Sequence, residues 1–130
     1  MVEKNKKECK SASFEMRDGY LYIRFKDEST VDLHEAKIHA QHCIDLCNGI
    51  KTPFVIDGLD ITTNMDDGAR QFFAEYQPLV NVRKAQAVLV NIMQSILLTN
   101  FFIKYHKPKN PIKVFDNLDD ALDWIKSLPS

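Results

Sequence analysis

The feature that most constrains the fold is a regular alternation of strand-like and helix-like segments after an early Asp18-Gly19 turn. Residues 14–18 and 20–26 are strand-like runs on either side of that turn, and an Asp-Gly pair in this setting favours a β-hairpin. Apolar residues occupy every second position of the later run, at Leu21, Ile23 and Phe25. One face of this strand is therefore expected to be buried.

Helical and strand patterns then alternate to the end of the sequence. Helices are predicted over residues 33–48, 65–77, 94–106 and 118–128. Strands are predicted over residues 53–57, 85–90 and 112–115. Alternation of this kind requires crossover connections and gives a sheet covered by helices. The order ββαβαβαβα predicts an α/β fold: a single domain with a mixed, mostly parallel five-stranded sheet and four helices.

Several residues are predicted to start and end these helices. The first helix is expected to begin after Thr30 or Asp32 and to end before Gly49. Its apolar stripe consists of Leu33, Ala36, Ala40, Cys43, Ile44 and Cys47. For the second helix, Thr62, Thr63 or Asn64 is the expected cap and Pro78 the expected end. Asn117 is expected to cap the last helix.

Composition limits the domain count and the compartment. A chain of 130 residues with a net charge of −1 fits one domain and offers no global field for a nucleic acid. Residues 1–12 are predicted to be a polar tail without a secretory signal, and residues 13–130 to form the domain. No apolar run reaches membrane-spanning length. Cys9, Cys43 and Cys47 have no disulfide spacing, so we expect free thiols and a cytoplasmic protein.

The sequence resembles the STAS fold of bacterial anti-sigma-factor antagonists, the SpoIIAA-like (STAS/SEC14-type) group, and its small uncharacterised bacterial members in particular. The resemblance spans most of the chain from Phe14 onward and consists largely of packing and turn residues. The stretches that carry it are Asp18-Gly19-Tyr20-Leu21-Tyr22, Val55-Ile56-Asp57, Ala69-Arg70-Gln71-Phe72-Phe73-Ala74, Asn100-Phe101-Phe102, Lys107-Pro108-Lys109-Asn110-Pro111 and Asp120-Ala121-Leu122-Asp123-Trp124-Ile125.

The resemblance implies a non-enzymatic regulatory or protein-interaction module. In the antagonists, a partner kinase phosphorylates a serine at the start of the helix after the third strand. The corresponding stretch here, residues 57–64, lacks the family's Asp-Ser pattern and the glycine that follows it. Thr62 and Thr63 are the hydroxyl residues nearby and are the candidates for a phospho-switch.

Loops after parallel strands gather at one edge of a sheet, where open α/β folds bind ligands. The residues expected at this ligand or partner edge are Asp57, Asp60, Asn91 and Ser95. Helix capping is the simpler role for the carboxylates and threonines of these loops. A Mg²⁺ site like that of a receiver domain is disfavoured, because Asp116 rather than a lysine follows the last strand.

Chemical motifs are sparse in this sequence. His39 and Cys43 have the i, i+4 spacing of a metal pair, with His42 and Cys47 nearby. Cys43 and Cys47 fall within an apolar stripe, however, so core packing is favoured over a metal site. The sequence contains no phosphate-binding glycine loop and no nucleophile elbow. We therefore expect no cofactor, no metal and no enzymatic activity.

The predicted third helix is apolar around most of its circumference, wider than one core-facing stripe requires. Ile96, Phe102 and Ile103 are therefore candidates for an oligomer or partner surface, with a homo-oligomer first. A basic loop lies beside them, with Lys104, Lys107, Lys109 and Lys113. These lysines and the apolar helix suggest the alternative function: binding of a small molecule or a lipid head group, with peripheral lipid contact.

Overall fold

A computed structural model describes residues 5–91 and 109–129 of the chain. The predicted hairpin is present as β2 (Ala12–Arg17) and β3 (Tyr20–Phe25), which pair antiparallel. The turn between them needs a glycine, because Gly19 has a φ of +85°, where a side chain would be strained. The hairpin thereby places Leu21, Ile23 and Phe25 on one face of the sheet.

Six strands form the main sheet of the described residues, in the order β1-β2-β3-β5-β7-β8. The strands beyond the hairpin are β1 (Lys6–Glu8), β5 (Thr52–Asp57), β7 (Arg83–Leu89) and β8 (Ile112–Phe115). The pairs β3–β5, β5–β7 and β7–β8 are parallel, whereas β1–β2 is antiparallel. The sheet is therefore mixed, with its parallel strands on the side away from the N-terminus.

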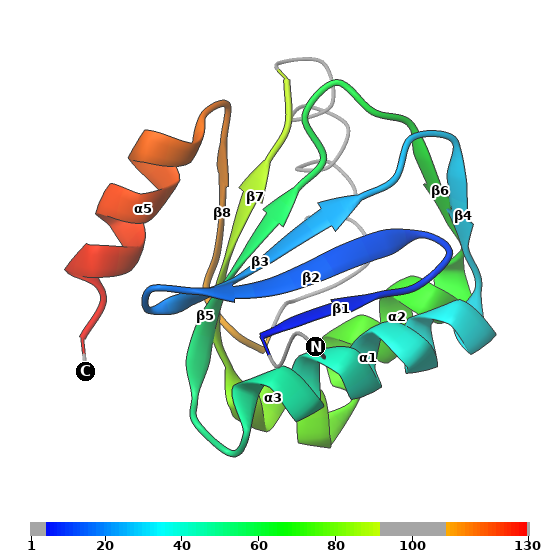
Figure 1. The fold of residues 1–130 in the computed structure, drawn as a ribbon, viewed down its shortest axis with the longest axis horizontal. Helices are drawn as coiled ribbons and strands as arrows, with labels where there is room; N and C mark the ends of the chain where they lie inside the picture. The colour runs from blue at the N-terminus through cyan, green and yellow to red at the C-terminus, as the bar shows by residue number, and fades with distance from the viewer. Residues whose placement is uncertain (1–4, 92–108, 130) are drawn as a thin grey trace.

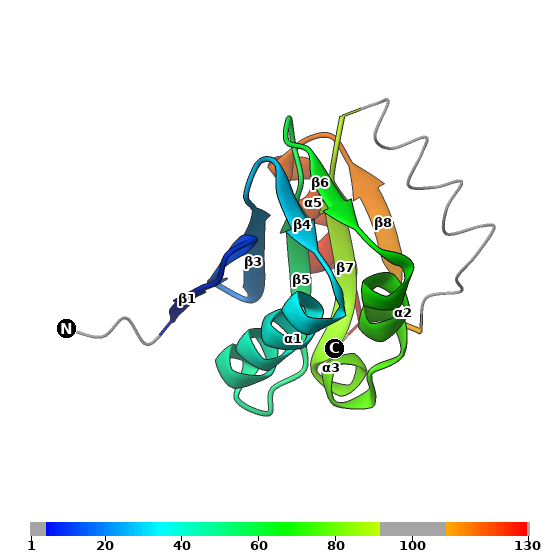
Figure 2. The same cartoon turned by 90° about the vertical axis from the view of Figure 1, so that its right-hand side faces the viewer.

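Helices cover both faces of this sheet (Figures 1 and 2). On one face lie α1 (Leu33–Cys47), α2 (Asp67–Glu75) and the short α3 (Gln77–Val82). On the other lies α5 (Leu118–Ser127), which packs against β7 and β8. The larger core lies under α1 and α3 and includes Phe14, Leu21 and Phe54. No helix of the described residues is long and apolar enough to cross a membrane.

A second, two-stranded sheet joins the first two helices at their starts. β4 (Ser29–Val31) pairs parallel with β6 (Thr63–Met65). Each strand leads directly into a helix cap. The Asp32 side chain accepts a hydrogen bond from the Glu35 N–H at 2.8 Å, and the Asp66 side chain accepts one from the Ala69 N–H at 2.8 Å. Figure 2 shows the two strands side by side above α1 and α2.

The predicted α/β class and mixed sheet are confirmed, with three differences in detail. The sheet has one strand more than the expected five, because β1 lies within the segment predicted to be a polar tail. Ser11 and Ala12, from the same segment, are 1% and 0% exposed. The α2 cap is Asp66 rather than Thr62, Thr63 or Asn64, because those three residues lie in or beside β6.

Further predictions concern the helices. Pro78 was predicted to end the second helix, but α2 ends at Glu75 and Pro78 lies in the first turn of α3, where its missing N–H is tolerated. Leu33 was placed on the buried stripe of α1, yet it is 42% exposed, because it is the first residue of the helix and lies beyond the edge of the core. Asp32 and Asn117 cap α1 and α5 as expected. The predicted helix over residues 94–106 falls outside the described residues.

Candidate binding cavity

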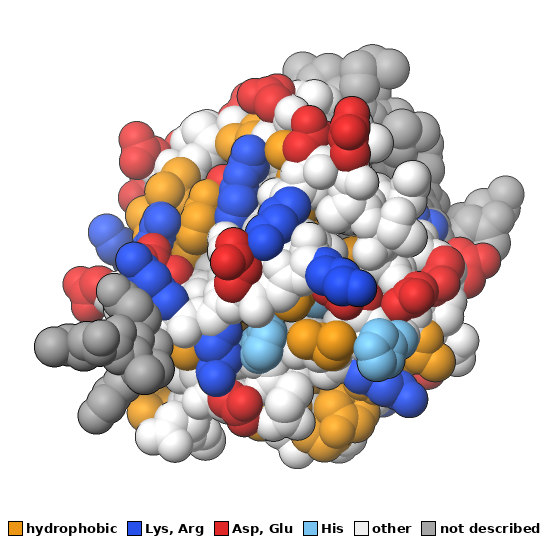
Figure 3. Space-filling view, turned by 45° about the vertical axis from the view of Figure 1, so that its right-hand side comes forward, with side chains coloured by type: hydrophobic (Ala, Val, Ile, Leu, Met, Phe, Trp, Pro, Cys, Tyr) orange, Lys and Arg blue, Asp and Glu red, His pale blue; other side chains and the backbone are white. Residues whose placement is uncertain are grey.

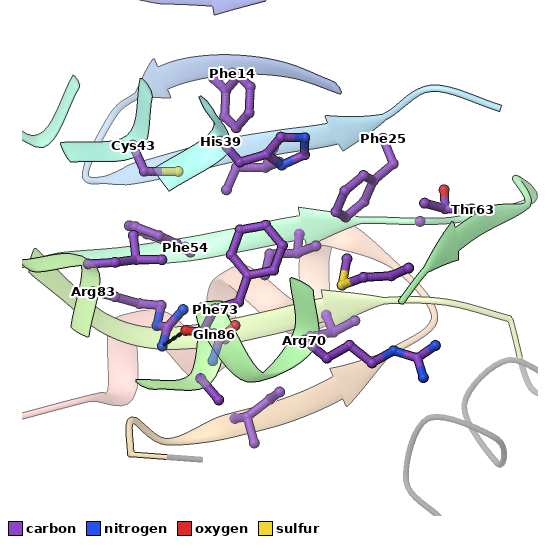
Figure 4. A pocket seen from close by; sticks show the side chains of 18 of the residues that line it. Phe14, Phe25, His39, Cys43, Phe54, Thr63, Arg70, Phe73, Arg83 and Gln86 are labelled. Carbon is purple, nitrogen blue, oxygen red and sulfur yellow. Dashed lines mark hydrogen bonds between the residues drawn. The ribbon is translucent and has the colours of Figure 1, made fainter. Parts of the chain in front are cut away.

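A cavity of about 290 Å³ lies between the helix layer and the main sheet (Figure 4). Its floor includes Ile23, Phe54 and Val88, from three neighbouring strands of the sheet. Its roof includes His39 of α1 and Phe73 of α2. Most of the lining is apolar, so the space suits an apolar group better than a cluster of waters.

A few polar side chains also line this cavity. Arg83 and Arg70 lie on opposite sides of it in Figure 4, with Phe73 between them. The other polar side chains of the lining include Gln86 of β7, Thr63 of β6 and His39. The described lining includes neither aspartate nor glutamate. Its formal charge is therefore positive.

His39 is surrounded by aromatic rings. The centroids of Phe14, Phe25 and Phe73 lie 5.2, 5.6 and 5.6 Å from that of the imidazole. The side chain is 2% exposed, and this burial lowers the pKa of His39 to about 4, against the opposing charge of Glu35. The imidazole is therefore neutral at physiological pH.

Behind His39, away from the apolar lining, lies a buried hydrogen-bond network. The Ser11 hydroxyl donates to Glu35 Oε1 at 2.8 Å and lies 2.6 Å from His39 Nε2. Since the hydroxyl proton goes to the carboxylate, the neutral imidazole carries its proton on Nε2 and donates to Ser11. Burial would raise the pKa of Glu35, but hydrogen bonds from Ser11 and Cys9 outweigh it and lower the pKa below the ordinary value.

This network is not arranged for nucleophilic catalysis. A serine nucleophile needs a histidine that accepts its proton, with an acid on the far side of the ring. Here the carboxylate of Glu35 takes the Ser11 proton directly, and Ser11 is 1% exposed. The arrangement therefore holds the residue that precedes β2 against α1 rather than activating a hydroxyl.

Metal-ligating atoms also meet at this point. One ligand atom each from Cys9, Glu35 and His39 lies within 4.8 Å of the others. The Ser11 hydroxyl lies among them, 3.7 Å from the Cys9 sulfur, and is hydrogen-bonded to the other two. The His39–Cys43 pair, for which the sequence favoured core packing over metal binding, is a different set, and burial raises the pKa of the Cys43 thiol. Cys43 and Cys47 are 3% and 2% exposed, as predicted for core residues.

Arg83 is a buried cation at the start of β7. It is 3% exposed, and its Nε and Nη2 atoms donate to Asn110 Oδ1 at 2.8 Å and to the Phe73 carbonyl at 2.9 Å. Burial lowers the pKa of Arg83 to about 10, which leaves the guanidinium protonated at neutral pH. Both acceptors are neutral, so neither compensates the charge.

The predicted edge of the sheet contains a second polar cluster, centred on Asp57. Its carboxylate accepts hydrogen bonds from the Tyr22 hydroxyl, from Arg24 Nη1 at 2.7 Å and from the Leu59 N–H at 3.0 Å. Burial and the bond to Asp57 raise the pKa of Tyr22 to about 12. Asp57 is 8% exposed, so these contacts anchor the loop after β5 and leave little of the carboxylate for a ligand.

The other predicted site residues are spread over the fold. Asp60 and Thr62 are exposed, and Thr63 lines the cavity from β6. The Thr62 N–H donates to Asp27 Oδ1 at 2.8 Å. Asn91 follows β7, at the same end of the sheet as Asp57. Lys109 and Lys113 are exposed, on either side of the start of β8. Ser95, Ile96, Phe102, Ile103, Lys104 and Lys107 lie outside the described residues.

On the face drawn in Figure 3, acidic and basic side chains are interspersed. Neither charge forms a broad field there. This view therefore offers no single-signed patch of the kind that steers a highly charged partner.

Ser11, Glu35 and Arg83 were not predicted as site residues. One signal was available for Glu35, which precedes His39 by four residues and so shares its helix face. Ser11 fell within the supposed tail. Arg83 stands next to Lys84 in a stretch for which neither a helix nor a strand was predicted, and an arginine is normally exposed.

Comparison of the structure with solved structures identifies the class of fold. The chain is similar to an uncharacterized protein of the DUF3478 family with a SpoIIAA-like fold, from Shewanella loihica PV-4. The TM-score is 0.59 at 19% sequence identity, covering 88% of this chain and 92% of the other. The predicted SpoIIAA-like fold is thus confirmed.

The sequence also matches a family profile over most of its length. Residues 14–129 match the family described as Domain of unknown function (DUF7793). The chain belongs to this family. A search of curated proteins found no match.

Proposed function

We propose that this protein is a non-enzymatic binding module that holds a small, mostly apolar molecule in the cavity between α1, α2 and the main sheet. The observation that carries the proposal is the cavity itself, about 290 Å³ with a mostly apolar lining. An engineered apolar cavity of about 150 Å³ stays dry and binds benzene. The cavity here has about twice that volume, which suits a molecule of about ten non-hydrogen atoms.

The side chains around the cavity favour binding over catalysis. His39 is neutral and donates to Ser11, and burial raises the pKa of the Cys43 thiol, so neither is an activated base or nucleophile. An apolar lining with a few placed polar groups is the usual composition of a small-molecule site.

Binding of 1-octanol, followed by ligand-observed NMR, tests the proposal. We expect saturable binding of one molecule per chain. Ala74 lines the cavity from α2, so Ala74→Phe should fill part of the space and reduce the affinity at least tenfold. Gln71→Phe is the matched control, because it adds the same ring to an exposed position of α2. Equal binding of 1-octanol to both variants would reject the proposal, and so would a wild-type protein that binds neither 1-octanol nor any of the other molecules titrated below.

We propose phosphorylation of Thr62 as a second candidate function, that of a regulatory protein-interaction module. The supporting observation is that Thr62 is exposed and directly precedes β6, whereas Thr63 is half-buried against the cavity. A phosphate on Thr62 would lie near Asp27, which already accepts from the Thr62 N–H, and like charges there would push the two segments apart. Thr62→Glu should change the affinity for a native partner, and Thr62→Val should not. An unchanged affinity in both variants counts against this role.

A further inference from the structure

Arg83 brings an unbalanced charge to the lining of a mostly apolar cavity. The guanidinium is 3% exposed and donates to an amide oxygen and a carbonyl oxygen. Within residues 5–91 and 109–129, no carboxylate forms an ion pair with it. Buried charges are normally paired, because removing a charge from water is costly.

The remainder of the lining does not supply the missing anion. Arg70 is a second cation, and the described lining contains neither aspartate nor glutamate. Asp67, the ion-pair partner of Arg70 at 3.8 Å, has a side chain that is 94% exposed. His39 is neutral at physiological pH. Among the residues that the structure describes, no carboxylate would therefore compete on Arg83 with a negative group that enters the cavity as part of a ligand.

We infer that the natural ligand is an amphipathic carboxylate, with an apolar body of about ten non-hydrogen atoms in the cavity and its carboxylate on Arg83. The inference rests on the proposed function and names the class of molecule bound. An arginine is suited to this role, since its planar guanidinium can bind both oxygens of a carboxylate. The phenylalanine rings and aliphatic side chains of the walls match an alkyl chain or an aromatic ring.

The test compares carboxylates with alcohols that have the same apolar body. Octanoate is paired with 1-octanol, and 2-naphthoate with 2-naphthalenemethanol, in calorimetric titrations of the full chain at pH 7.5. The first pair probes alkyl acids and the second aromatic acids. For at least one pair, we expect the carboxylate to bind tenfold or more tightly than its alcohol. This comparison needs no variant and so does not depend on how a mutant folds.

Variants then assign the preference to Arg83. Arg83→Met should bring the Kd of the carboxylate to within about twofold of that of the alcohol. The matched control is Arg17→Met, which removes an arginine that lies outside the cavity over the Tyr22 ring. Arg17→Met should retain the full preference. Circular dichroism checks that both variants are folded.

The possible outcomes separate this inference from the proposed function. If each alcohol binds as tightly as its carboxylate, the cavity is a site for neutral apolar molecules, and the inference is overturned while the proposed function stands. If neither member of either pair binds, the proposed function itself fails. A preference that survives in folded Arg83→Met, or disappears in Arg17→Met, would place the anion elsewhere and also overturn the inference.

Discussion

His39 combines three structural roles in one side chain. It lines the cavity, packs against Phe14, Phe25 and Phe73, and is hydrogen-bonded to Ser11. Protonation would place a positive charge among three aromatic rings. It would also add a second N–H donor, whereas the hydrogen-bond network uses only the one on Nε2. The stability of the whole domain is therefore coupled to one imidazole.

This coupling predicts a pH dependence of stability. In the unfolded chain His39 takes up a proton near its ordinary pKa of 6.5, whereas in the folded protein it does so only near 4. Between these values the unfolded state binds more protons, so the free energy of unfolding decreases as the pH is lowered, by about 3 kcal/mol in total. Above pH 6.5 the imidazole is mostly neutral in both states, so His39 makes its full contribution to the free energy of unfolding.

Urea unfolding between pH 7.5 and 5 measures this effect. The lowest pH of the titration stays above 4.5, the ordinary pKa of a glutamate. Below that pH, protonation of Glu35 in the unfolded chain would lower the free energy of unfolding further. His39→Gln should flatten the dependence, whereas His34→Gln, at an exposed position of α1, should keep it. The same slope in wild type and His39→Gln would contradict the role assigned to His39.

At the residue scale, sequence patterns identify apolar core positions better than buried polar ones. Cys43 and Cys47 were predicted as core residues from helical periodicity and are buried. Ser11 and Arg83 are buried only because their partners come from distant segments: Glu35 lies 24 residues from Ser11, and Asn110 lies 27 residues from Arg83. The periodicity of a local segment does not reveal partners that are distant in the sequence. Arg83, the buried charge of the candidate site, was therefore not predictable.

At the scale of elements, Asp66 determines where α2 begins. Its side chain accepts from the Ala69 N–H at 2.8 Å, so Asp66→Ala should lower the free energy of unfolding by about 1 kcal/mol. The matched control is Asp67→Ala, which removes a 94% exposed carboxylate one residue later and should cost a few tenths of a kcal/mol. Urea denaturation measures both. Equal decreases in the free energy of unfolding would show that negative charge near the helix start, rather than the capping hydrogen bond, stabilises α2.

The elements that sequence patterns missed are those too short to show a period. β1, β4 and β6 have three residues each, which is less than two repeats of a strand pattern. The six-residue α3 was also missed, since it is shorter than two helical turns. β6 accounts for the displaced cap of α2, since Thr63 and Asn64 are used in a strand. The longer strands and α1 were predicted to within about two residues, because alternation or helical spacing repeats several times within them.

At the scale of the whole molecule, a ligand in the cavity should stabilise the fold. A molecule that binds the folded state alone adds about 2.7 kcal/mol at one hundred times its Kd, and for a chain of this size the melting temperature should rise by about 10 °C. Differential scanning calorimetry with increasing octanoate measures the shift. Ala74→Phe should show little of it, and a full shift in that variant would place the octanoate outside the cavity.

The roof of the cavity is joined at both ends. At one end β4 pairs with β6, and the Asp66 N–H donates to the Val31 carbonyl at 3.2 Å, so the starts of α1 and α2 are fixed to each other. At the other end α3 contacts both helices. These contacts fix the spacing of α1 and α2 before a ligand binds. Binding therefore requires little further ordering of the protein, and little conformational entropy is lost. We therefore expect the cavity to discriminate among ligands by their width, since a ligand that is too wide would have to separate α1 from α2.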